Sequence, residues 1–255
     1  MTTSQALSAP TLEDAAAEIL FRLASTEELM VVVGRDPGPA GRCIRDCPER
    51  VVVAPGVTGR FAVADGVWIG GSRVVTVLED RLVDLVPAAG CGHPNVLLTT
   101  HAAHLATARD AGLVVVQPGW PGDVEPLLRD ALAAPEPVLI RLHACTAQAP
   151  EPEQPPELDS HRVLRRGRAG LLVAAGAGAP LLVHVAAALT ARAVNVTAVE
   201  MHTIRPSTGV DPARTDSVLL VGAAGVEDAS QLVGVPFGSG SVSRLTDAVL
   251  EVLPR

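Results

Sequence analysis

The chain has 255 residues, enough for two α/β domains of ordinary size, and a net charge of -8 with a pI near 5.3. This charge gives no reason to expect a nucleic-acid partner or an anionic membrane surface, since both bind clustered basic side chains. All 20 basic residues are arginines, and there is no lysine or tyrosine. Schiff-base lysine chemistry, a Walker-type phosphate loop and a tyrosine acid or base are therefore excluded.

The N-terminal residues and the cysteines indicate a cellular compartment. Residues 1–20 contain no basic residue and no long apolar run, so we expect no signal peptide, no transmembrane span and a cytoplasmic location. The thiols should then be reduced. No pair has CxxC spacing, so we expect structural thiols and no metal site, although Cys91, His93, His143 and Cys145 are residue types that bind metals.

Residues 11–110 alternate short apolar runs with amphipathic segments. A helix should begin after Thr11, with Asp14 three positions on completing a capping box. We expect strands at 30–33, 50–53, 74–78 and 95–99, and helices at 62–69, 81–86 and 101–110. The Gly- and Pro-rich residues 34–41 are predicted to form a loop.

Residues 113–142 have the pattern of a βαβ unit. An apolar run at 113–116 is followed by Pro- and Gly-rich residues, an amphipathic segment from Asp123, and a second apolar run at 138–142. Asp123 is a suitable N-cap, and the prolines after residue 134 end the helix. The two strands should lie parallel in a sheet that is covered on both faces.

Residues 147–159 form the clearest domain boundary. They hold four prolines and four acidic residues and only one large apolar residue, Leu158, so they should form a semi-extended linker. We therefore predict a first domain at 1–146, a linker at 147–160 and a second domain at 161–255.

The second domain should contain strands at 171–174, 194–199 and 218–221 and helices at 180–192 and 241–253. Gly176 and Gly178 lack the third glycine of a dinucleotide fingerprint and are interpreted as a tight turn. The predicted fold class is α/β, with two open, mostly parallel sheets covered by helices on both faces.

A family resemblance rests on three segments. The acidic loop and helix around Glu125, followed by PVLIRL at 137–142, resemble the end of the pyrimidine-binding domain of transketolases. Residues 165–206 and 233–253 are similar to the beginning and end of the transketolase C-terminal domain. The resemblance implies the C-terminal half of a transketolase that uses thiamine diphosphate with Mg²⁺. It also implies a partner subunit that holds the diphosphate and the metal, a heterotetramer, and a sugar or sugar phosphate as substrate.

The sequence departs from the family at the cofactor. The family has a Gly-hydrophobic-Ala-Glu motif whose glutamate binds the aminopyrimidine ring, and the matching residues 56–59 end in Gly59, which has no side chain. By resemblance the cofactor-binding positions are Thr58, Gly59, Phe61, Arg81 and Asp84. The family's aromatic residues after the third strand are replaced here by residues 77–78, Val and Leu.

The histidines of the predicted helix at 101–110 leave two interpretations open. His101 matches one histidine of the family's active-site loop and is the candidate catalytic residue, whereas His104 matches none. Alternatively, both are helix-face histidines three positions apart. Glu49 and Glu79 are the carboxylates nearest in sequence to the absent glutamate.

Later polar residues are also ambiguous. His202, Arg205 and Asp211 lie where the family contacts its partners, but they are equally plausible as solvent-facing loop residues.

Three functions remain open. The first is the C-terminal subunit of a split transketolase-like enzyme that transfers a two-carbon ketol unit. The others are a non-catalytic scaffold or regulatory subunit of such a complex, and the β-like subunit of a 2-oxoacid dehydrogenase.

Overall fold

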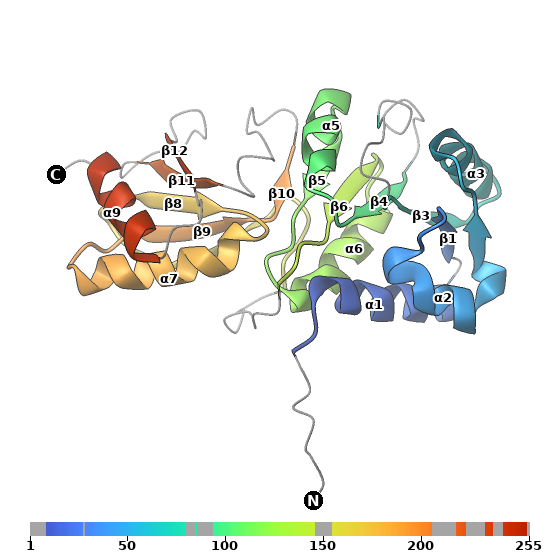
Figure 1. Ribbon diagram of the computed structural model, residues 1–255, viewed down its shortest axis with the longest axis horizontal. Helices are drawn as coiled ribbons and strands as arrows, with labels where there is room; N and C mark the ends of the chain where they lie inside the picture. The colour runs from blue at the N-terminus through green and yellow to red at the C-terminus, as the bar shows by residue number, and fades with distance from the viewer. Residues whose placement is uncertain are drawn as a thin grey trace, which may run out of the picture.

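The computed structural model describes residues 9–27, 29–79, 85, 94–145, 155–205, 218–222, 233–236 and 242–253. The chain builds two α/β units, each around its own sheet, as Figure 1 shows. The predicted α/β architecture with two sheets is confirmed. None of the described helices is long and apolar enough to cross a membrane.

The first sheet has seven strands in the order β10-β5-β6-β4-β3-β1-β2. Its strands are β1 (Leu29–Val33), β2 (Val51–Val53), β3 (Arg73–Val77), β4 (Val96–Thr99), β5 (Val114–Val116), β6 (Val138–Arg141) and β10 (Thr203–Ile204). All neighbouring pairs are parallel except β10 with β5. The predicted parallel pairing of the two strands in the βαβ unit is confirmed.

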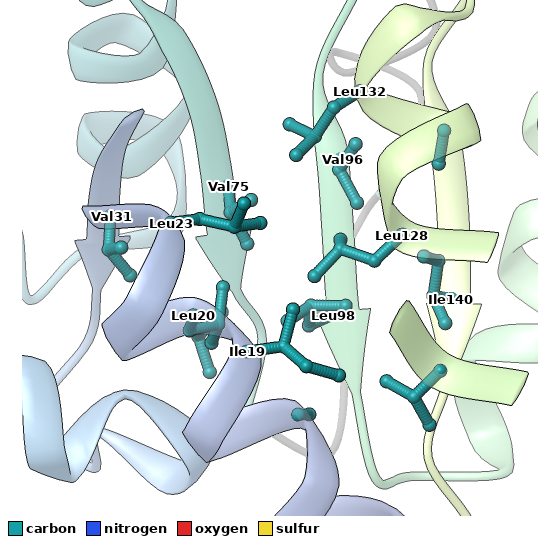
Figure 2. Close-up of a cluster of buried hydrophobic side chains, with 14 of the residues drawn as sticks. Ile19, Leu20, Leu23, Val31, Val75, Val96, Leu98, Leu128, Leu132 and Ile140 are labelled. Atoms are coloured by element: carbon teal, nitrogen blue, oxygen red, sulfur yellow. The ribbon is translucent and has the colours of Figure 1, made fainter. Parts of the chain in front are cut away.

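Helices cover both faces of this sheet, as Figure 1 shows. The helices are α1 (Leu12–Thr26), α2 (Gly41–Asp46), α3 (Val57–Ile69), α5 (Ala103–Ala111) and α6 (Val124–Ala133), with short 3-10 turns at η1 (Gly38–Ala40), η2 (Pro48–Arg50) and η3 (Pro121–Asp123). Side chains from α1 and α6 meet the sheet in a core of leucine, isoleucine and valine, which Figure 2 shows. The capping box of α1 is confirmed, because Asp14 N donates to Thr11 Oγ1 at 3.0 Å and Thr11 N donates to Asp14 Oδ2 at 2.9 Å.

The second sheet has the order β12-β11-β8-β9-β7. Its strands are β7 (His161–Arg165), β8 (Leu171–Ala174), β9 (Thr197–Met201), β11 (Val218–Gly222) and β12 (Val233–Pro236). Only β8 and β9 pair in parallel, and the other three pairs are antiparallel, so this sheet is mixed. The helices α7 (Gly178–Ala191) and α9 (Val242–Val252) share its core through leucines and valines.

Several predictions need correction. Asp123 lies at the N-cap of α6, but its side chain makes no capping bond and instead pairs with Arg162. The sequence pattern does not predict α2, β7, β10 or β12. The helix expected at 81–86 lies almost wholly outside the described residues. Edge strand β7 was missed because its charged residues do not alternate as a half-buried strand should.

The two units are joined by more than the chain connection. Strand β10 follows β9 of the second sheet yet pairs with β5 of the first, at the junction visible in Figure 1. Arg205, just after β10, donates to Asp159 Oδ1 at 2.6 Å and also pairs with Glu136. His202 is fully buried. The interpretation of His202 as a solvent-facing loop residue is therefore wrong, whereas Arg205 is partly exposed and ion-paired. Asp211 lies outside the described residues.

Candidate functional site

The candidate site lies at the carboxyl edge of the first sheet. Strands β1, β3 and β4 run parallel, so the residues that follow them, Gly34, Glu79 and Thr100, emerge at the same edge. Open parallel sheets commonly bind ligands at this edge. The predicted catalytic residue His101 also lies here, directly after Thr100.

Glu79 and His101 are held together at this edge. Thr100 Oγ1 donates to Glu79 Oε2 at 3.0 Å, and His101 Nε2 lies 2.8 Å from the backbone oxygen of Glu79 and 3.9 Å from its Oε2. The carbonyl oxygen can only accept, so Nε2 of His101 carries the proton. Burial raises the pKa of Glu79, while the bond from Thr100 and the charge of His101 oppose that shift.

A second polar pair, Thr99 and His104, lies next to Thr100 and His101 and is buried. The buried Thr99 Oγ1 is 2.6 Å from His104 Nδ1 and accepts a bond from the backbone N–H of His101 at 3.0 Å. The rings of His101 and His104 meet edge to face at 5.8 Å. His101 precedes helix α5, so the two histidines are not both helix-face residues, and His104 is fully buried. The sequence pattern did not single out Thr99 or Thr100, whose roles depend on the positions of these strand ends.

The predicted cofactor-binding residues do not converge on this cluster. Thr58 and Gly59 are exposed in the first turn of α3, and a Cβ added at Gly59 would meet no atom within 4 Å. Phe61 is 3% exposed and packs in the core beside Leu78, Leu97 and Leu105. Arg81 and Asp84 lie outside the described residues.

Arg60 is a feature that the sequence analysis did not identify. It is 1% exposed, and its Nη1 donates to the carbonyl oxygen of Val77 at 3.4 Å. The same guanidinium lies over Gly34, where a Cβ would clash with it. A buried arginine thus fills the space between the ends of β1 and β3. The sequence signal for it is a single arginine in an otherwise uncharged stretch, residues 51–64.

The fold has relatives among solved structures, although no family model and no curated protein matches the sequence. A split-gene transketolase described as an inactive beta4 tetramer is similar with a TM-score of 0.66 and 20% identity, over 82% of this chain and 78% of that one. The chain has a transketolase-like fold. Two transketolase mutants from Pichia stipitis, one described in complex with xylulose 5-phosphate, match with TM-scores of 0.61 and 0.60. They are 13% and 14% identical, and the match covers 78% of this chain and 35% of each of theirs.

The transketolase-like fold raises the question of whether the residues fit thiamine diphosphate. Position 59 offers no carboxylate to a pyrimidine ring, and Phe61, the aromatic residue nearest to it in sequence, packs in the core. Glu79 does not take the place of the missing glutamate. Its Oε2 accepts a hydrogen bond from Thr100, and its Oε1 packs against Gly38, where an added Cβ would lie 2.8 Å from it. Within the described part of the chain, no group of three or more His, Cys, Asp or Glu side chains could hold a metal ion. These residues do not fit the aminopyrimidine of the cofactor.

Proposed function

We propose that this chain is the C-terminal-half subunit of a split transketolase-like complex and that it acts there as a non-catalytic subunit. A separate polypeptide would supply the half that binds the diphosphate and Mg²⁺, and the pair would assemble as a heterotetramer. The match to 78% of a split-gene transketolase chain supports the subunit role. The observation that carries the non-catalytic role is Gly59, an exposed position with space for a side chain and none present.

The exposed face of α3 is the surface that we assign to the partner. Thr58, Gly59 and Gly66 are exposed on this helix, and a Cβ at either glycine would meet no atom within 4 Å. On the same helix, Trp68 and Ile69 are 41% and 77% exposed, and Val53 on β2 is 60% exposed. Small residues allow a partner to approach the backbone closely, and exposed apolar residues gain from being covered.

We expect the substitution Ile69→Asp to weaken assembly with the diphosphate-binding subunit by about 10- to 100-fold, because it places a charge in an apolar contact. The affinity is measured by analytical ultracentrifugation of this protein with the candidate partner. Val252→Asp, which changes a residue that is 39% exposed on α9, is the matched control and should leave the affinity unchanged. Equal affinities for the two variants would show that α3 is not the contact.

A second candidate function is favoured by the cluster at the carboxyl edge. Glu79 is a mostly buried carboxylate with a raised pKa beside His101, which is an arrangement typical of acid–base catalysis. If this cluster is a working site, the complex is an enzyme that transfers a two-carbon ketol unit between sugars or sugar phosphates.

The variant Glu79→Gln separates the two functions. If the cluster catalyses proton transfer, this change should lower the turnover of the complex with a ketose phosphate donor by about 10²- to 10⁴-fold. The matched control is Glu49→Gln, which alters an exposed carboxylate on η2. For a non-catalytic subunit, we expect both variants to bind the partner like the unaltered protein and to show the same background turnover.

A further inference from the structure

A buried ionic cluster joins the two α/β units. Arg162 on β7 reaches from the second unit to Asp123 of η3 in the first, with Nη2 and Oδ1 2.6 Å apart. Its other terminal nitrogen, Nη1, lies 3.4 Å from Oε2 of Glu200 on β9. The side chains of Arg162, Asp123 and Glu200 are 11%, 3% and 0% exposed. One guanidinium therefore serves two carboxylates across the boundary between the units.

Closely packed residues surround the cluster. Trp120 is 1% exposed, and its ring centroid lies 5.2 Å from the guanidinium carbon of Arg162. Gly119 lies against Glu200 so closely that a Cβ there would clash with Oε1, and it would come within 2.9 Å of Cβ of Ala179 at the start of α7. The carboxyl of Glu200 is thus enclosed by residues from both units.

The charges in this cluster do not balance when both carboxylates are ionised. Two negative charges and one positive charge would leave a net negative charge in a buried environment, which is costly. Burial and then the charge of Asp123 raise the pKa of Glu200 to about 8, with Arg162 opposing the shift. His202 also faces Asp123 and Arg162, and burial lowers its pKa, so it supplies little compensating charge at neutral pH. Its Nε2 lies 2.8 Å from the carbonyl oxygen of Glu157.

We propose that Asp123, Arg162 and Glu200 form a proton-dependent latch between the two α/β units, which is closed while Glu200 carries a proton and opens when Glu200 ionises. Ionisation of Glu200 adds a second negative charge beside Asp123, and only one of the two is balanced by Arg162. Separation of η3 from β7 and β9 relieves this repulsion by letting water reach the carboxylates. Because Trp120 is covered by Arg162 from the other unit, opening exposes its ring.

The test uses Trp120 as a reporter. The chain has two tryptophans, so Trp68→Phe leaves Trp120 as the sole indole in the full-length protein. We expect its emission to move to longer wavelength and its acrylamide quenching constant to rise several-fold between about pH 7 and about pH 9, around the pKa of Glu200. The far-UV circular dichroism should stay unchanged over this range.

Glu200→Gln in the Trp68→Phe background should abolish the transition, because the amide keeps the shape of the protonated acid and cannot ionise. Glu27→Gln, which alters a carboxylate in surface ion pairs with Arg73 and Arg129, is the control and should retain it. The latch is contradicted if Trp120 stays buried up to about pH 9.5, if Glu200→Gln shows the same transition, or if the helical signal is lost together with the fluorescence change.

Discussion

Replacing Arg162 with methionine is expected to lower the free energy of unfolding by about 3 to 5 kcal/mol at neutral pH. Methionine keeps much of the apolar volume beneath Trp120 but leaves Asp123 and Glu200 without their shared cation. Asp123 is 2% exposed, and its Oδ2 accepts no hydrogen bond from the described residues, so the remaining charge is not solvated. Removing one partner of a buried ionic group is costly for this reason. Urea unfolding followed by circular dichroism measures the effect.

A surface ion pair provides the matched control for Arg162→Met. Arg192 on α7 pairs with Asp247 on α9, and these side chains are 44% and 56% exposed. Water and salt screen this pair, so Arg192→Met should cost no more than about 1 kcal/mol. If the two variants lose the same stability, the cluster at the unit boundary contributes no more than a surface contact does.

The stability of the protein should fall as the pH rises from about 4.5 to about 8 through the contribution of Glu200. Its pKa in the folded protein is about 8, above the ordinary value of 4.5. The folded state therefore binds more protons than the unfolded chain between these values. The stabilisation is present in full below the ordinary pKa and is lost as the pH rises through the folded value. By this linkage the loss is on the order of a few kcal/mol.

Glu200→Gln isolates this contribution from other groups that titrate. Burial lowers the pKa of His143 to about 4 and also lowers that of His202, so both histidines reduce stability as the pH falls through their ordinary range. The unfolding free energies of both proteins are measured in urea at about pH 5, 7 and 8.5. The advantage of Glu200→Gln should be small at the lowest pH and should grow with pH. Parallel pH profiles would show that Glu200 keeps its ordinary pKa in the folded protein.

Much of the fold follows from local sequence patterns. The apolar runs that became β1, β3, β4, β5, β6 and β8 are short and rich in valine, leucine and isoleucine, and turn residues flank most of them. Their positions were therefore predictable to within about two residues. Strand β10 was not predictable in this way. Its two residues pair with β5 only because the second unit packs beside the first, and no local pattern records that contact.

The candidate site was predicted less well than the fold. Both His101 and Gly59 were identified through the family resemblance. Sequence reasoning did not identify the link between Glu79 and Thr100, because these residues are 21 positions apart and meet only when β3 and β4 pair. Asp123 was also predicted only in part. Its place before α6 predicted a capping hydrogen bond, but its side chain pairs instead with Arg162, which is distant in sequence.

The most direct test of the proposed function is deuterium exchange at the thiazolium C2 of thiamine diphosphate, followed by NMR. The sample contains this protein, the candidate diphosphate-binding subunit, thiamine diphosphate and Mg²⁺, and ultracentrifugation first establishes that a complex forms. A non-catalytic subunit predicts a stable complex in which C2 exchanges no faster than in the free cofactor. Exchange well above that of the free cofactor, and dependent on this subunit, would contradict the account and establish the complex as an enzyme.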